Sequence, residues 1–189
     1  SILLALTLSL PPSVWAKVPL ASVQSIKLNG DIFCTVFSIN SREGNWASAG
    51  HCAHYAAQVF AVSGLDPTID GKDAIIAYID ENYDVAVFQS EAKAYSLRLS
   101  QKNINVGDPV DIIGYPYGLA KVITKGFVGA RNIPIMHPSY QIHMRSDILD
   151  ITVAGGNSGS PVLNKDGEVV GILWGGIEHI HALSIPRES

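Results

Sequence analysis

Short runs in which apolar residues alternate with polar or small ones dominate the chain beyond residue 17. Alternation with a period of two places successive side chains on opposite faces and is typical of half-buried β-strands. The first half predicts strands at 23–28, 32–39, 46–49, 58–62, 74–79 and 85–88. The second half predicts strands at 109–113, 121–128, 140–145, 161–163, 169–173 and 180–185. Turn pairs such as Asn29-Gly30 and Asp166-Gly167 separate the runs.

Helical periodicity is confined to a turn or so after Cys52, so crossover helices between strands are not expected. About a dozen strands without such helices predict an antiparallel all-β fold, built as barrels or as a sandwich. The most polar and least strand-like stretch, 90–105, is the best connector between two halves of six strands each. We expect a first lobe at 17–95 and a second at 100–189.

The first sixteen residues carry no charge and differ from the rest of the chain. Their apolar run, 2–10, is too short to span a bilayer, which takes about 20 residues. It is typical of the core of a secretory signal, and Val14-Trp15-Ala16 offers small residues at a cleavage site. We therefore expect 1–16 to be an N-terminally incomplete signal peptide and 17–189 to be secreted, extracellular or periplasmic, without stable membrane insertion. A buried N-terminal strand or helix and an uncleaved membrane anchor are the alternatives.

Composition excludes two classes of protein. Of the 189 residues 47% are hydrophobic and the net charge is only −4, which excludes a disordered chain. With 13 Lys+Arg against 17 Asp+Glu there is no basic excess to neutralise phosphates, so no nucleic-acid partner is expected.

The two cysteines of an exported chain predict one disulfide, Cys34–Cys52. A zinc site made of Cys34, His51, Cys52 and His54 is the alternative, but its adjacent ligands do not match the usual spacing. His179 and His181 would share one face of a strand without a third ligand. We expect neither a metal nor a cofactor.

Three short segments carry groups that complete one another chemically: Ala47–Cys52, Tyr83–Phe88 and Gly155–Val162. A serine hydroxyl needs a base to become a nucleophile, and an imidazole suits that task near neutral pH. A buried carboxylate then orients the imidazole, and glycines beside the serine let two N–H groups face the developing oxyanion. These requirements assign Ser158 as nucleophile, His51 as base and Asp84 as the orienting acid, with the amides of Gly156 and Ser158 as oxyanion donors.

The sequences SAGHCA, YDVAVF and GGNSGSPV, in that order, resemble the trypsin-like serine peptidases of the chymotrypsin fold. Residues 106–118 look like the second-lobe entry of bacterial HtrA-type peptidases, and 155–163 with 167–176 look like glutamyl endopeptidases. The resemblance implies two six-stranded antiparallel β-barrels with the active site in the cleft between them. It also implies a secreted serine endopeptidase that forms an acyl-enzyme on peptide or protein substrates. The cysteine pair matches the disulfide beside the catalytic histidine in many members.

The resemblance places the substrate-binding residues at Thr152 and Val153 and at Leu173-Trp174-Gly175-Gly176, where the peptide would add as an antiparallel strand. Trp174 would line the substrate subsite that neighbours the first subsite. The alternative is that Trp174 is only an aromatic residue of the core. Cleavage after Arg or Lys needs a carboxylate where Thr152 stands. Cleavage after Glu needs a histidine where Leu173 stands and a hydroxyl where Val153 stands. We therefore expect a small or medium apolar side chain in the first subsite.

A catalytically inactive binding module with a protease fold is the rival interpretation. Such a chain usually lacks one member of the triad, whereas this one has all three. The sequence carries no signal for an oligomeric state.

Overall fold

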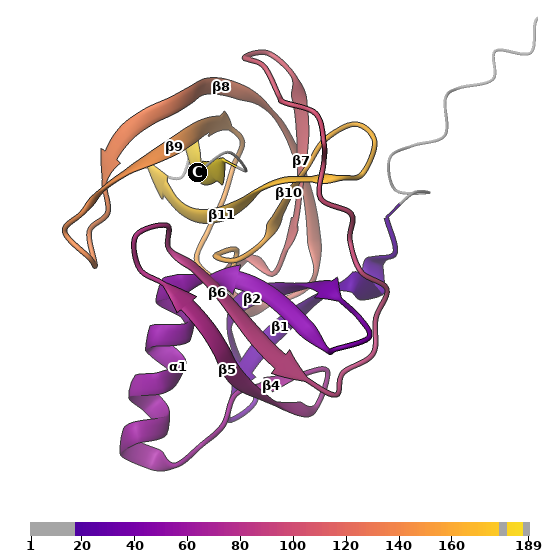
Figure 1. Cartoon of the computed structure of the whole chain (residues 1–189), viewed down its shortest axis with the longest axis vertical. Helices are drawn as coiled ribbons and strands as arrows, with labels where there is room; N and C mark the ends of the chain where they lie inside the picture. The colour runs from indigo at the N-terminus through magenta and orange to yellow at the C-terminus, as the bar shows by residue number, and fades with distance from the viewer. Residues whose placement is uncertain (1–17, 178–180, 187–189) are drawn as a thin grey trace, which may run out of the picture.

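The protein folds into two closed six-stranded antiparallel barrels, in a computed structural model that describes residues 18–177 and 181–186. The predicted signal peptide, 1–16, and His179 lie outside the described residues. The fold class predicted from the sequence is confirmed. Figure 1 shows one barrel together with helix α1 in its lower half and the other barrel in its upper half.

The first barrel closes in the order β1-β2-β3-β6-β5-β4. Its strands are β1 (Val23–Leu28), β2 (Asp31–Asn40), β3 (Asn45–Ala49), β4 (Thr68–Ile69), β5 (Lys72–Asp80) and β6 (Val85–Ser90). A short 3₁₀ turn, η2 (Leu20–Ser22), precedes β1. Asn29 and Gly30 join β1 to β2 with φ of 50° and 90°, which is the backbone that a two-residue hairpin requires.

The second barrel closes in the order β10-β11-β12-β9-β8-β7. Its strands are β7 (Pro109–Gly114), β8 (Val122–Met136), β9 (His143–Asp150), β10 (Pro161–Leu163), β11 (Val169–Ile177) and β12 (His181–Pro186). The 3₁₀ turn η3 (Pro116–Gly118) links β7 to β8. Strand β8 runs well past the predicted end at 128, because two register shifts against β9 and the left-handed Asn132, at φ 57°, interrupt its alternation.

The strand predicted at 58–62 is wrong, because these residues lie in helix α1 (Gly50–Ser63). The run Gln58–Val62 is rich in the β-branched and aromatic residues of strands, whereas the buried positions Cys52, Ala53 and Ala56 have the spacing of one helix face. Gly64 ends the helix in the left-handed conformation, with its N–H bonded to the carbonyl of Phe60. Strand β4 in turn was missed, since two residues carry no detectable period.

Apolar side chains from both barrels meet in one cluster, which includes Phe37 and Ala47 of the first barrel and Ile113, Leu163 and Val169 of the second. The connector, 91–108, crosses between the barrels along one side of the molecule (Figure 1). Because the barrels are packed together, the loops at their junction are held in fixed relative positions.

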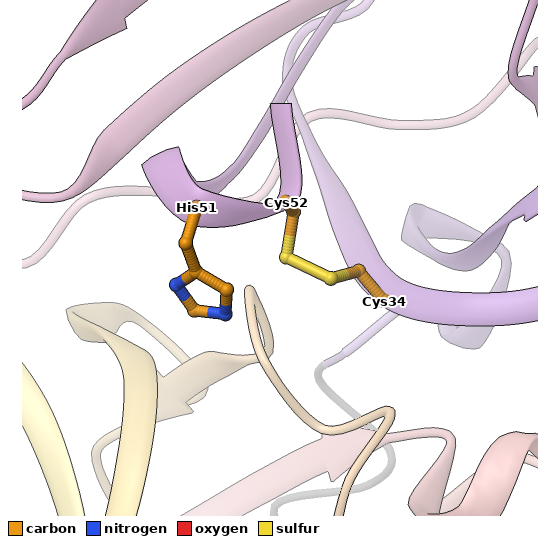
Figure 2. Close-up of side chains that lie close together, drawn as sticks. All are labelled: Cys34, His51 and Cys52. Carbon is orange, nitrogen blue, oxygen red and sulfur yellow. A yellow bond between two sulfur atoms is a disulfide. The ribbon is translucent and has the colours of Figure 1, made fainter. Parts of the chain in front are cut away.

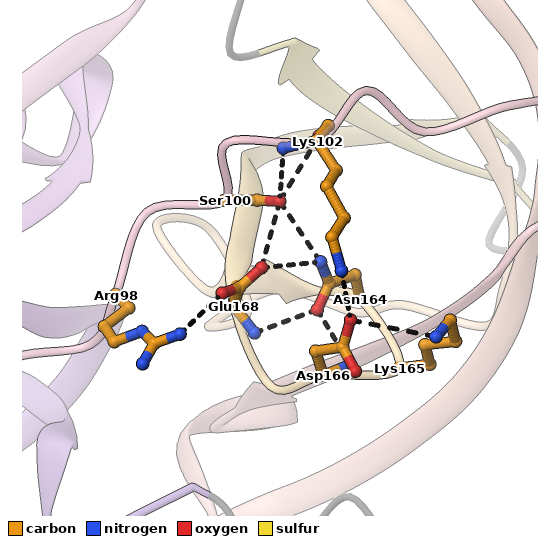
Figure 3. A network of polar contacts seen from close by, with 7 residues as sticks. All are labelled: Arg98, Ser100, Lys102, Asn164, Lys165, Asp166 and Glu168. Atoms are coloured by element: carbon orange, nitrogen blue, oxygen red, sulfur yellow. Dashed lines mark hydrogen bonds and ion pairs between the residues drawn. The ribbon is translucent and has the colours of Figure 1, made fainter.

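Polar side chains fix the connector to the turn between β10 and β11 (Figure 3). The carboxylate of Glu168 accepts hydrogen bonds from Arg98, at 3.0 Å, and from the hydroxyl of Ser100, at 3.2 Å. Asn164 donates to both Ser100 and Glu168. The Arg98 guanidinium, followed by the Asn164 amide, holds the pKa of Glu168 below its ordinary value.

Candidate active site

His51 and Asp84 lie side by side because the strands that precede and follow them are paired. Ala49 at the end of β3 lies opposite Val85 at the start of β6, which brings the first turn of α1 to the turn before β6. Asp84 occupies that turn with φ 49° and is fully buried. Its Oδ2 lies 2.8 Å from Nδ1 of His51, and its Oδ1 accepts the backbone N–H of His51 at 2.6 Å.

The hairpin between β8 and β9 supplies two further groups to Asp84. The hydroxyl of Tyr140 donates to Oδ1 at 3.1 Å, and Nε2 of His137 lies 3.3 Å from Oδ2. Burial, and next the negative charge of Asp84, raises the pKa of Tyr140. Burial lowers the pKa of His137, against the opposing effect of Asp84. Sequence reasoning missed both residues.

Ser158 lies in the loop between β9 and β10, which the other barrel holds in place. The carbonyl of Ser158 accepts the N–H of Thr35, on β2, at 2.8 Å. Gly159, at φ 86°, donates to the carbonyl of Leu173 at 2.7 Å. A Cβ on Gly159 would collide with Ser48 and with the carbonyl of Thr35, so only glycine fits next to the serine.

The peptide groups around Gly156 are held from two sides. The carbonyl of Gly155 accepts the N–H of Tyr117 at 2.6 Å, and the carbonyl of Gly156 accepts the hydroxyl of Thr35 at 2.8 Å. The N–H groups of Gly156 and Ser158 have no acceptor among the described residues. Both donors are therefore available to an oxygen atom of a ligand.

A pocket of about 260 Å³ opens beside Ser158. It is lined by Val153, Ala154, Gly155, Ser158, Leu173, Gly175 and Gly176. None of these side chains is charged, and Thr152 is exposed and not among them. Four of the six residues assigned to substrate binding from the sequence thus line this pocket.

Trp174 lines a second pocket, which shares Gly175 and Gly176 with the first and also contains His51 and His137. The Trp174 side chain is 5% exposed, and its Nε1 donates to the hydroxyl of Ser146 at 3.1 Å. Trp174 is therefore both a core residue and a wall of the site, and the shared glycines place Ser158 and His51 on one continuous cleft.

Cys34 and Cys52 form a disulfide between β2 and the first turn of α1, next to His51 (Figure 2). These sulfurs are bonded to each other, so they cannot serve a metal as thiolates. Besides the group of Cys34, His51 and Cys52, one other group of possible metal ligands is present among the described residues. Its donor atoms, from His51, Asp84 and His137, all lie within 4.8 Å of one another. Metal-bound histidine normally donates its other ring N–H, whereas Nδ1 of His137 accepts the N–H of Ser139 at 3.2 Å. This trio therefore does not fit a metal ion.

Two closed barrels with a histidine and a buried aspartate on one and a glycine-flanked serine on the other define a serine-peptidase architecture. Residues 34–172 match the trypsin-like peptidase domain family, and the chain belongs to that family. Relatives at the level of sequence agree with the HtrA-type resemblance.

Two relatives are named probable periplasmic serine endoprotease DegP-like. The one from Rhizobium meliloti is 35% identical over 111 residues, which is 57% of this chain and 20% of the relative. The one from Pseudomonas fulva is 37% identical over 95 residues, 49% of this chain and 19% of the relative. The matched part of the chain thus corresponds to about a fifth of the length of each relative.

Solved structures share the fold at low sequence identity. The active form of the protease Rv3671c from M. tuberculosis superposes with a TM-score of 0.74 at 19% identity, covering 94% of this chain and 80% of that one. The HtrA-type protease AlgW with a decapeptide gives 0.73 at 16% identity, covering 93% and 63%. No helix among the described residues is long and apolar enough to cross a membrane.

Proposed function

We propose that the chain is an exported serine endopeptidase in which Ser158, His51 and Asp84 form the catalytic triad. The observation that carries the proposal is the contact between His51 and Asp84. Its Nδ1 faces the carboxylate of buried Asp84 at 2.8 Å and therefore carries the proton. The lone pair of its Nε2 is then left to accept a proton from the hydroxyl of Ser158.

The reaction follows from this arrangement in two steps. Oγ of Ser158 attacks the scissile carbonyl while Nε2 of His51 takes its proton, and the oxyanion accepts the N–H groups of Gly156 and Ser158. The tetrahedral adduct breaks its C–N bond, His51 protonates the leaving amine, and an acyl-enzyme remains. Water, deprotonated by His51, then releases the acid and restores the serine.

A fluorophosphonate probe tests this mechanism, because it reacts only with an activated serine. The wild-type protein is expected to be labelled and Ser158→Ala is not. Ser160→Ala is the matched control, since Ser160 is a buried hydroxyl of the same loop and should leave labelling intact. Absence of labelling in the folded wild type would instead indicate a binding module with a protease fold.

The uncharged pocket beside Ser158 supports a small or medium apolar side chain at the cleaved position. A charged substrate group would lose its hydration there without a partner among the lining residues. Cleavage of a mixed peptide library, read by mass spectrometry, should show cuts after small or medium apolar residues. A sharp preference for Glu, Arg or Lys contradicts this assignment.

The periplasmic relatives and the uncharged first sixteen residues together support export. N-terminal sequencing of the protein recovered from an expressing bacterium should find a new end near residue 17 in the exported fraction. An intact N-terminus on a protein retained in the cytoplasm contradicts export.

A further inference from the structure

The ring of His137 is buried at the tip of the β8–β9 hairpin and clamped between two aromatic side chains. It is 2% exposed, with the ring centroids of Tyr140 at 4.5 Å and Trp174 at 4.7 Å. The backbone of His137 closes the hairpin, since its N–H donates to the carbonyl of Ile142 and its carbonyl accepts the N–H of Gln141. The ring therefore has one position and one orientation.

The hydrogen bonds of this ring determine which nitrogen carries the proton. Nδ1 accepts the backbone N–H of Ser139 at 3.2 Å, so it holds a lone pair. Burial lowers the pKa of His137, so the ring is neutral at neutral pH and has a single proton. That proton is on Nε2, whose nearest acceptor is Oδ2 of Asp84 at 3.3 Å. Nε2 forms no well-aligned hydrogen bond among the described residues, so its 3.3 Å approach to Oδ2 is an electrostatic contact.

The carboxylate of Asp84 is thus held from both barrels. Each oxygen accepts one hydrogen bond from His51 and faces one donor of the hairpin, Tyr140 at Oδ1 and His137 at Oδ2. Three hydrogen bonds and the 3.3 Å contact with Nε2 of His137 thus surround a carboxylate that has about four acceptor positions. Since Asp84 is fully buried, these donors take the place of water around its charge.

We propose that His137 is a positioning residue of the peptidase, whose neutral Nε2–H form faces Asp84 and, with Tyr140, keeps that carboxylate oriented toward His51. This inference rests on the proposed triad. The β8–β9 hairpin of the second barrel then helps to orient His51, the base of the first barrel, through Asp84.

Other titratable groups lie next to His137, Tyr140 and Asp84, and their charges would contribute to the pH profile of labelling. Glu81 also raises the pKa of Tyr140 through its charge. His54 lies 3.1 Å from Glu81, and its ring meets that of Tyr140 at 5.4 Å. The charge of a protonated His51 would lower the pKa of His137 further.

The activity test measures the second-order rate of fluorophosphonate labelling between pH 5 and 9. A small probe is chosen so that the labelling rate depends little on contacts with the pocket that His137 lines. His137→Leu removes the donor at similar bulk, Tyr140→Phe removes the other donor, and His137→Gln keeps an N–H at about the position of Nε2. His143→Gln is the matched control, because His143 is an exposed histidine of the same hairpin.

His137→Leu should lower the labelling rate at pH 7.5 by roughly 10-fold, as expected for losing a close polar contact with a charged group. It should also move the acid limb of the profile to higher pH, because a carboxylate with fewer donors favours protonation of the neighbouring imidazole more strongly. Tyr140→Phe should move the acid limb in the same direction. His137→Gln and the control should stay close to wild type. A leucine variant that matches the control in rate and acid limb overturns the proposal.

A second readout is independent of activity. ¹⁵N NMR of the ring nitrogens in Ser158→Ala protein should find His137 neutral with its proton on Nε2. A proton on Nδ1, or a charged ring at neutral pH, overturns the proposal even if the wild type is never labelled. If His137→Leu fails to fold, as judged by its urea midpoint, Tyr140→Phe and the NMR measurement still decide.

Discussion

The side chain of Thr35 makes a sharp prediction, because one hydroxyl of the first barrel holds two backbone groups of the second. Its Oγ1 donates to the carbonyl of Gly156 at 2.8 Å and accepts the N–H of Tyr115 at 3.2 Å. Thr35 is fully buried. Thr35→Val keeps the shape and the strand preference but leaves both backbone groups unpaired. At about 1 to 3 kcal/mol for each of the two unsatisfied groups, the free energy of unfolding should fall by about 2 to 6 kcal/mol.

Activity should fall as well, since the Gly156 carbonyl is one of the anchors of the oxyanion loop. Deleting an oxyanion donor outright costs roughly 100- to 1,000-fold in kcat, and a loosened donor should cost less, roughly 10- to 100-fold. Urea unfolding measures the first effect, and fluorophosphonate labelling at a temperature where the variant is fully folded measures the second. Thr35→Ser should retain labelling because it keeps the hydroxyl. Thr124→Val, at a half-buried threonine of β8, is the control.

A Thr35→Val protein with the urea midpoint and labelling rate of the wild type would refute this reasoning. Loss of stability without loss of labelling would show that Thr35 supports the fold and not the oxyanion loop.

Three further predictions concern other features of the site. Replacing Cys34 and Cys52 by alanine opens a loop with a sequence separation of 18 and should lower the free energy of unfolding, measured in urea, by about 3 kcal/mol; a reduced wild type with an unchanged urea midpoint contradicts this. Burial lowers the pKa of His137, so the unfolded chain binds a proton there more readily than the folded one. The free energy of unfolding should therefore fall as pH drops below the ordinary histidine value of 6.5, and less steeply in His137→Gln, as urea titrations at several pH values will show. Gly156→Ala should lose most labelling, because the added Cβ meets the carbonyl of Tyr115 and φ is 92°; normal labelling of this variant would remove Gly156 from the oxyanion site.

The family and the fold could be predicted because neighbouring residues carry their motifs. The glycines around Ser158 and the strand that follows Asp84 are local patterns, and the order of the three segments points to one fold. Local patterns also gave most of the strands. Helix α1 was not predicted in full because the residues around Val59 and Phe60 have strand-like composition, while its buried face lies earlier, at Cys52–Ala56.

The partners of Asp84 in the second barrel could not be predicted, for a different reason. Tyr140 is 56 positions away along the chain, and its place depends on where β8 and β9 end. Strand β8 extends to Met136 only through irregularities in its pairing, which carry no period that a sequence pattern reveals. His137 read alone is an ordinary histidine, and only the packed hairpin gives it an acceptor. Thr35 was missed likewise, since its role lies in contacts of its hydroxyl across the cleft.

The exchange of hydrogen bonds between the barrels has a consequence for how the molecule can be divided. Thr35 of the first barrel completes the loop of Ser158, while Tyr140 of the second completes the surroundings of Asp84. The connector, 91–108, holds none of these groups. Two fragments produced separately, cut within it, would each be inert and would become a peptidase only when bound to each other. Because the proposed active site needs groups from both barrels, the labelling of two such fragments would measure the association of the halves.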